Sequence, residues 1–229
     1  MSDAATSLTN TLADRYTIER ILGYGGMATV HLAEERKHKR KVAIKVLKQE
    51  FGASVGAERF LREIGIAAQL SHPHIVPLID SGESDGSLYY VSPYIAGGSL
   101  RDRLSRQNKI PIDDALRITH EVGAALDYAH RNGFVHRDVK PENILFADDH
   151  ALLADFGIAH VCASADGESL TLAGLALGTP EYMSPEQASG ETDIGIPGTS
   201  TALRVFSTRC WPVSRHSEER ARVRRWRSR

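Results

Sequence analysis

The sequence predicts an α+β fold in which a small antiparallel β-sheet precedes a mainly helical region. Short β-like runs gather in the first fifty residues, and two longer segments with apolar residues at helical spacing follow. Neither an internal repeat nor a low-complexity tract interrupts this order. At 229 residues, the chain is long enough for one large domain or two small lobes.

Three β-like runs are expected to pair as the antiparallel sheet. They are YTIERIL, TVHLAEE and KVAIKVL, and they lie between Tyr16 and Leu47. A glycine-rich turn separates the first two runs, and the charged cluster RKHKRK separates the second from the third. After a helical segment, LYYVSPYI returns to a strand.

Two amphipathic helices are predicted from their apolar positions. One lies in AERFLREIGIAAQL and the other in DDALRITHEVGAALDYAH, where Gly133 is the expected stop. Short strands are then expected at FVH, ILF and ALLADF. The apolar positions are Ala57, Phe60, Leu61, Ile64, Ala67 and Ala68 in the first helix, and Ala115, Ile118, Val122, Ala125 and Ala129 in the second.

The composition favours a globular protein of a reducing compartment. Hydrophobic residues make up 41% of the chain and charged residues 25%. Cys162 and Cys210 form no CxxC pair, which argues against a disulfide framework or a zinc knuckle. The first residues lack the pattern of a signal peptide, and no apolar run of ~18 residues could span a membrane. We therefore expect a cytoplasmic protein.

Residues suited to phosphate chemistry lie in the turns. In ILGYGGMATV, Gly23 and Gly25 would let backbone N–H groups approach phosphates, although an ordinary β-turn would look the same. Lys45 stands among apolar residues in VAIK, where an inward-pointing lysine needs a partner such as Glu63. Taken singly, Lys45 could equally be an exposed strand lysine and Glu63 a solvated helix carboxylate.

The segment HRDVKPEN, followed by DFG, gives a stronger signal. Phosphoryl transfer needs a carboxylate for the hydroxyl proton, a cation on the moving phosphate and oxygen ligands for Mg²⁺. Asp138, Lys140 and Asn143 lie in one loop, and Asp155 follows at the spacing of a β-hairpin. This one segment supplies every group that the chemistry needs.

With these motifs in order, the chain resembles the eukaryotic-like protein kinases, most closely the bacterial serine/threonine kinases. GYGGMATV, VAIKVLK, HRDVKPENIL, DFGIA and GTPEYMSPEQ carry the likeness, which covers residues 14 to 190. The resemblance implies a two-lobed kinase fold that clamps ATP. It divides the chain into a disordered N-terminus (1–13), an N-terminal lobe with glycine-rich loop and hinge (14–95), and a partial C-terminal lobe with catalytic loop and activation segment (96–190).

The resemblance also implies ATP and Mg²⁺ as cofactors. Asp138 would orient the acceptor hydroxyl and accept its proton, and Lys140 would hold the γ-phosphate. Lys45 would contact the α- and β-phosphates and pair with Glu63. The expected ligands of Mg²⁺ are Asn143 and Asp155, and the remaining expected ATP contacts are Gly23, Gly25, Gly26, Val30, Ala43, Pro93 and Ile95.

Three further roles follow from the resemblance. Thr171, and after it Ser169, are the expected autophosphorylation sites, and Arg137 would pair with the phosphate. Ser92 would be a small gatekeeper that opens a pocket behind the adenine site. His136 is expected to be a packing residue and not a general base.

The amino-acid composition of the sequence changes after residue 190. From Thr199 onward there are nine Arg and two Glu, with no Lys or Asp, so this part carries +7 and the rest −8. Codons allowed for Thr199 to Ser217, read from one base earlier, can encode DIYSLACVLYEMLAGEPPF, which resembles the helix that a kinase would place there. We therefore expect a frameshift between about Gly190 and Thr199, which would make residues 191–229 a non-native, disordered, Arg-rich tail and leave the large lobe incomplete.

The predicted function is ATP-dependent phosphorylation of serine or threonine in protein substrates. The partners would be those substrates and a second copy of the chain for autophosphorylation, with no nucleic acid and no membrane segment. Two alternatives remain open: an inactive nucleotide-binding kinase fragment, and an interaction module whose basic tail binds nucleic acid or acidic membrane.

The gene sequence tests the frameshift directly. Reading from one base before the Thr199 codon should open a frame that encodes DIYSLxCVLYEMLxGxPPF and then further amphipathic helices. Stop codons in that frame before the Ser217 codon would contradict the frameshift and favour a genuine basic tail.

Overall fold

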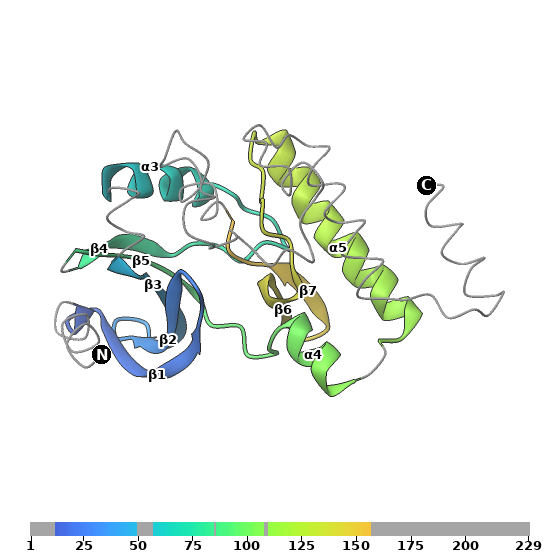
Figure 1. Cartoon of the computed structure of the whole chain (residues 1–229), viewed down its shortest axis with the longest axis horizontal. Helices are drawn as coiled ribbons and strands as arrows, with labels where there is room; N and C mark the ends of the chain where they lie inside the picture. The colour runs from blue at the N-terminus through green and yellow to red at the C-terminus, as the bar shows by residue number, and fades with distance from the viewer. Residues whose placement is uncertain (1–11, 50–56, 85, 108–109, 157–229) are drawn as a thin grey trace.

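Five strands form one antiparallel sheet with β3 at its centre. The computed structural model describes residues 12–49, 57–84, 86–107 and 110–156. The sheet order is β1-β2-β3-β5-β4 (Figure 1), which confirms the predicted antiparallel sheet. The strands are β1 (Tyr16–Tyr24), β2 (Ala28–Glu35), β3 (Arg40–Leu47), β4 (Asp80–Ser84) and β5 (Ser87–Pro93).

Apolar side chains cover both faces of this sheet. Val42 and Ile44 of β3 are fully buried in one cluster, with Leu12 and Tyr16 from the start of the described chain. Leu12 is thus buried although it lies in the range for which the sequence predicts disorder. Tyr16 also donates a hydrogen bond from its hydroxyl to Asp80 Oδ2 (3.1 Å), and burial together with Asp80 raises the pKa of Tyr16 to about 12.

The other face of the sheet packs against helix α3 (Ala57–Ala67). Phe60, Ile64 and Ala67 are the buried residues of α3, at the spacing of one narrow helical stripe. Leu61, which the apolar pattern also included, is 38% exposed because it lies outside this stripe. Together, α3 and the five strands form the N-terminal lobe.

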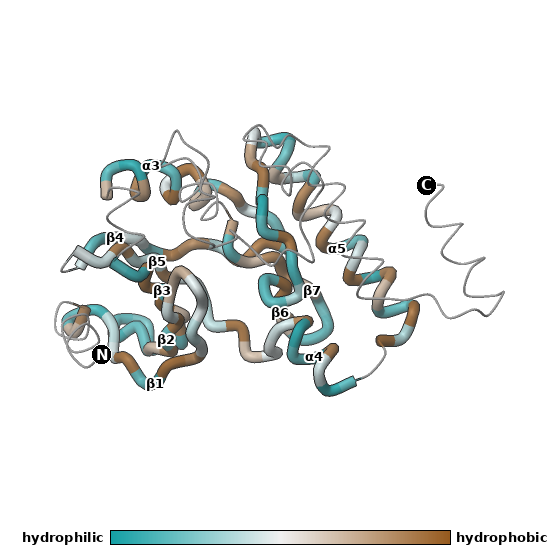
Figure 2. The backbone as a smooth tube through the Cα atoms, viewed as in Figure 1, coloured by the Kyte–Doolittle hydropathy of each residue, from teal (hydrophilic) through white to brown (hydrophobic). Residues whose placement is uncertain are grey.

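The C-terminal lobe is built on helix α5 (Ile112–Arg131). Its buried residues include all five apolar positions predicted for it, and Gly133 follows the helix with φ +76°, so both predictions are confirmed. Hydrophobic and hydrophilic stretches alternate along α5 (Figure 2), and its apolar side packs on Phe146 and Leu153. The smaller elements of this lobe are α4 (Leu100–Arg106), the 3₁₀ turn η1 (Pro141–Asn143), β6 (Ile144–Ala147) and β7 (His150–Leu153).

Local sequence explains most differences from the predicted elements. α4 begins with a capping box in which Ser99 and Asp102 bond each other's backbone N–H groups, a signal that the apolar pattern does not contain. β4 has the sequence DSGES, which lacks the apolar alternation of a strand. The strand predicted at FVH is wrong: this segment is irregular, because its backbone leads into the catalytic loop and pairs with no neighbouring strand.

Two connections fasten the lobes together. The first connection is the segment around residues 74–76, which lies along β7. Leu153 N donates to His74 O (2.9 Å), and Val76 N donates to Leu153 O (2.9 Å). In the second, Gly97 N donates to Phe146 O (3.1 Å), and Phe146 N donates to Gly98 O (3.0 Å). A Cβ on Gly97 would lie 2.2 Å from Phe146 O, so this approach requires glycine.

Gly97→Ala should therefore destabilise the protein by about 1–3 kcal/mol, because the new methyl group meets backbone that cannot rotate away. Chemical denaturation measures this change. Gly65→Ala is the matched control: Gly65 lies within α3, where an added Cβ would have nothing within 4 Å, so the same change should stabilise the helix by about 0.5–1 kcal/mol. Equal stability of Gly97→Ala and wild type would contradict the steric argument.

Candidate active site

The register of the sheet brings three residues of the expected nucleotide site, Gly23, Val30 and Lys45, into one row with Tyr90. Gly23 pairs with Val30, Val30 with Lys45, and Lys45 with Tyr90. Directly paired residues project on the same face of a sheet, and so do residues two apart in one strand. Ala43 and Ser92, a pair in the neighbouring row, therefore lie on this face too.

The glycine-rich turn between β1 and β2 leaves room beside its backbone. Gly25 N donates to Ala28 O (2.8 Å), which closes the turn. A Cβ on Gly23 or Gly26 would have nothing within 4 Å, and the neighbouring Tyr24 is 78% exposed. Space is thus open beside the backbone of Gly23 and Gly26, whereas a Cβ on Gly25 would lie 3.2 Å from Ala28 O.

The catalytic loop gathers two polar side chains around the carboxylate of Asp138. Lys140 Nζ lies 2.6 Å from Asp138 Oδ2, and Asn143 Nδ2 donates to the same oxygen (2.9 Å) and to Asp138 O (2.9 Å). Asn143 is buried at the end of η1, and Asn143 O accepts from Ala154 N (2.8 Å). The structure therefore brings together the three loop residues that the sequence singled out.

His136 links the backbone of this loop to the backbone at Ala154 through its two ring nitrogens. It is fully buried, and the backbone N–H of Asp138 donates to Nδ1 (3.2 Å), which leaves Nε2 to donate to Ala154 O (2.9 Å). Burial lowers the pKa of His136, and the ring meets Phe156 edge to face at 4.5 Å. A neutral, fully bonded imidazole agrees with the packing role expected for His136.

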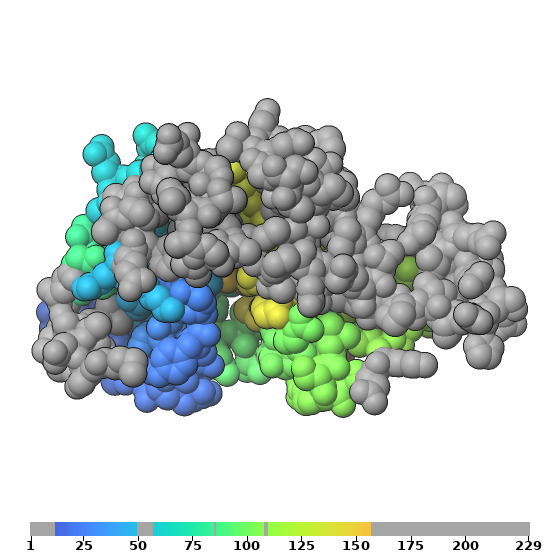
Figure 3. All heavy atoms as spheres, in the orientation of Figure 1, coloured from blue at the N-terminus to red at the C-terminus, as the bar shows by residue number. Residues whose placement is uncertain are grey.

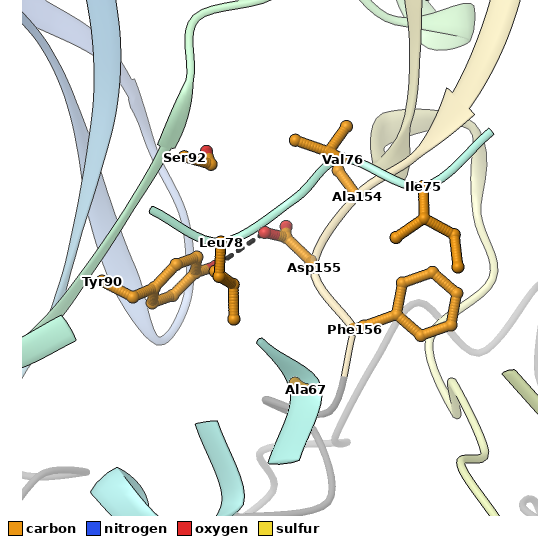
Figure 4. Close-up of a pocket in the computed structure, with 9 residues that line it drawn as sticks. All are labelled: Ala67, Ile75, Val76, Leu78, Tyr90, Ser92, Ala154, Asp155 and Phe156. Carbon is orange, nitrogen blue, oxygen red and sulfur yellow. Dashed lines mark hydrogen bonds between the residues drawn. The ribbon is translucent and has the colours of Figure 1, made fainter. Parts of the chain in front are cut away.

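Asp155 joins the two lobes. Its Oδ2 lies 2.6 Å from Lys45 Nζ, and its Oδ1 accepts from the Tyr90 hydroxyl (2.6 Å), as Figure 4 shows for Tyr90. Burial raises the pKa of Asp155, but Lys45 and the Tyr90 hydroxyl outweigh burial, so the net pKa lies below its usual value. The backbone of Asp155 is left-handed, with φ +66°.

The site lies where the two lobes face each other. Figure 3 shows a hollow between the strands of the N-terminal lobe and α4, with atoms of the segment near residue 140 at its edge. Asp155 and Asn143 supply the oxygen atoms that Mg²⁺ prefers, since Asn143 turns its Nδ2 to Asp138 and keeps Oδ1 as an acceptor. These residues fit a magnesium ion.

A model of the protein kinase domain matches residues 16–207. The chain belongs to the protein kinase family. It is 42% identical over 187 residues to the serine/threonine-protein kinase PknB of Mycobacterium leprae, and 41% identical over 193 residues to PknH of Mycobacterium bovis. These matches cover 79% and 83% of the chain, but only 30% and 32% of the two relatives.

Solved structures show the same kinase fold. The kinase domain of PknI from M. tuberculosis superposes with a TM-score of 0.70 at 33% sequence identity. The match covers 86% of this chain and 72% of that one. The predicted α+β kinase fold is thereby confirmed, as is the resemblance to bacterial serine/threonine kinases.

One expected contact of this kinase is not made. Glu63 forms its ion pair with Arg62 (3.6 Å), and Lys45 pairs with Asp155 instead. Among the residues that the structure describes, Asp155 is the carboxylate paired with Lys45, and Tyr90, the strand partner of Lys45, hydrogen-bonds the same carboxylate. The role of Glu63 toward ATP stays a prediction.

The space behind Ser92 is smaller than the sequence suggested. Ser92, Tyr90, Asp155 and Phe156 line a cavity of about 20 Å³, which is room for about one water molecule. Figure 4 shows the Tyr90 ring beside this space. A small residue at position 92 therefore does not by itself open a large back pocket, because other side chains, among them Tyr90, enclose the space.

Pro93, Ile95 and Arg137 are the remaining predicted site residues that the structure describes. Pro93 ends β5, and Ile95 follows it in the connection to Gly97, as the expected hinge requires. Arg137 precedes Asp138 with φ +63°. Thr171, Ser169 and the whole Arg-rich tail lie outside the described residues, so their roles stay predictions.

Within the described residues, no helix has the length and apolar character needed to cross a bilayer.

Lys45 and Asp155 should stabilise the fold together. In a double-mutant cycle with Lys45→Met and Asp155→Asn, we expect a coupling energy of about 0.5–3 kcal/mol in the free energy of unfolding. The pair of Arg131 and Asp127 on α5 is the control: its distance (2.8 Å) is close to that of the Lys45–Asp155 pair (2.6 Å), but it is about 70% exposed and should give only about 0.3–0.5 kcal/mol. Equal coupling in both cycles would show that the interlobe pair contributes no more than a surface pair.

Proposed function

We propose that this protein transfers the γ-phosphoryl group of ATP to serine or threonine hydroxyls of protein substrates. The observation that carries this proposal is the arrangement of Lys140 and Asn143 around the Asp138 carboxylate, together with the Lys45–Asp155 pair that joins the two lobes. Two positive groups and two metal-ligand types thus converge between the lobes, where phosphate charge must be neutralised. The relatives named as serine/threonine-protein kinases support this choice of acceptor.

Asp138 is the group that takes the proton. As the acceptor oxygen forms its bond to the γ-phosphorus, the bond to the β-phosphate oxygen breaks with its electron pair, and ADP leaves. The hydroxyl proton passes to Asp138, whose carboxylate is oriented by Asn143. Lys140 lies close enough to the same carboxylate to neutralise charge on the transferred group.

The N-terminal lobe would hold the nucleotide. Lys45 would bind the α- and β-phosphates, and the backbone of the glycine-rich turn would cover them. Asn143 and Asp155 would hold Mg²⁺, whose positive charge would offset that of the phosphates. Pro93 O and Ile95 N are the backbone groups that would meet the adenine edge, because proline has no N–H to offer.

The acceptor includes a second copy of this chain. Thr171 and Ser169 are the hydroxyls that the resemblance marks for autophosphorylation, and Arg137 beside Asp138 is the cation that would hold the resulting phosphate. This proposal concerns the 229 residues at hand, which span about a third of the length of the curated relatives.

Two substitutions separate nucleotide binding from transfer. Lys45→Ala should weaken ATP binding about 10- to 100-fold, because a charged hydrogen bond to phosphate is lost. Asp138→Asn should retain ATP binding and lose at least about 100-fold in transfer, because Asn cannot accept the proton. Nucleotide titration and radiolabelled phosphate transfer to a protein acceptor measure the two effects.

Lys37→Ala and Asp127→Asn repeat the same chemical changes at exposed positions and should leave both measurements unchanged. Full transfer by Asp138→Asn would exclude Asp138 as the proton acceptor. A wild-type chain that binds ATP but transfers no phosphate would instead favour the nucleotide-binding fragment.

A further inference from the structure

Tyr90 contacts the expected metal ligand through a neutral hydroxyl. Each oxygen of the Asp155 carboxylate has its own donor: Lys45 Nζ at Oδ2 and the Tyr90 hydroxyl at Oδ1, both at 2.6 Å. Lys45 and Tyr90 face each other across β3 and β5. One rung of the sheet thus fixes both oxygens of a carboxylate that belongs to the other lobe.

The two donors differ in what a metal ion would do to them. The Lys45 ammonium carries the same sign of charge as Mg²⁺, so it and the ion compete for Oδ2. Lys45 is also the residue that would turn to the phosphates of ATP. The phenol of Tyr90 is uncharged and contacts the opposite oxygen, so it can keep its hydrogen bond while the carboxylate binds a cation through Oδ2.

Packing keeps the Tyr90 hydroxyl in place. The side chain is 3% exposed and belongs to the apolar cluster that contains Phe60 and Ile64 of α3. Lys45 Nζ lies 5.8 Å from the centre of the Tyr90 ring, which adds a cation–π contact between the two residues. A ring held in this way directs its hydroxyl with little freedom (Figure 4).

Asp155 needs such support. Its backbone is in the left-handed region, which is unfavourable for a residue with a side chain, and it lies just beyond the end of β7. Ala154 before it and Phe156 after it are buried apolar residues. Within the described residues, Lys45 and Tyr90 are therefore the side chains that hydrogen-bond the carboxylate.

We propose that Tyr90 is a positioning residue of the metal site, whose hydroxyl holds Asp155 Oδ1 so that Oδ2 faces the cation once Lys45 turns to the phosphates. This inference rests on the proposed function, because it concerns the nucleotide-bound metal of that reaction. It gives the Tyr90 hydroxyl a function in metal binding, whereas packing alone would explain only the burial of the ring.

Tyr90→Phe removes the hydroxyl and keeps the ring. The test titrates Mg²⁺ into the full chain in the presence of a fluorescent ATP analogue and records nucleotide binding. The Mg²⁺ concentration at half-maximal response should rise about 10- to 100-fold, which is the usual effect of removing a group that orients a metal ligand. Binding of the analogue without Mg²⁺ should stay within about twofold of wild type, because the hydroxyl contacts Asp155 and not the nucleotide.

Tyr89→Phe is the matched control. Tyr89 is the preceding residue of β5, is 6% exposed and packs in the cluster on the opposite face of the sheet. It undergoes the same loss of one buried hydroxyl, and its Mg²⁺ response should equal that of wild type.

Three results would overturn the inference, and they are distinguishable. If Tyr90→Phe keeps the Mg²⁺ response of wild type, Tyr90 does not position the metal ligand, and the proposed function stands. If binding with and without Mg²⁺ falls by the same factor, the role of Tyr90 is structural only. If nucleotide binding by the wild-type chain does not respond to Mg²⁺, the proposed function itself is wrong, and the inference fails with it.

Discussion

The carboxylate of Asp155 is the point on which the arrangement of the two lobes depends. It belongs to the C-terminal lobe, yet both of its oxygens are held by residues of the N-terminal lobe, Lys45 and Tyr90. A partly buried carboxylate is stable only with a cation and hydrogen-bond donors beside it. Placing it correctly therefore requires the central strands, the end of β7 and the connections between the lobes to be in place at once.

The register of the strands places Lys45 and Tyr90 on the same face of the sheet, next to Asp155. Val30, Lys45 and Tyr90 lie on one face because three strands pair without a shift between them at this row. A slip of one residue in β3 would turn Lys45 toward the apolar cluster that contains Val42 and Ile44. Burial of those two residues on the opposite face thus fixes the lysine in the site.

Local sequence was enough to predict the catalytic loop but not its partners in the other lobe. Asp138, Lys140 and Asn143 lie within six positions of one another, so one motif indicates them together. The contacts of Asp155 join residues 110 and 65 positions apart, and they depend on strand register and on how the lobes meet. For this reason the sequence predicted Lys45 and Asp155 as site residues, paired Lys45 with Glu63, and indicated no role for Tyr90. Strand register combined with the expected position of Lys45 was the signal that could have found Tyr90.

The close contact of Gly97 with Phe146 sets where the two lobes can turn. Because residues 97–99 are hydrogen-bonded to β6 almost as an added strand, this part of the linker moves with the C-terminal lobe. The other connection is fastened to β7 in the same way through His74 and Val76. On the other side, Tyr94 N is bonded to Lys41 O of β3 and Ile79 N to Val91 O of β5, so any rotation between the lobes would have to bend the short stretches between these bonds, at Ile95 and Ala96 in one connection and at Pro77 and Leu78 in the other. A rotation about these stretches would widen the outer part of the space between the lobes more than its base, and it would leave the internal hydrogen bonds of the catalytic loop unchanged.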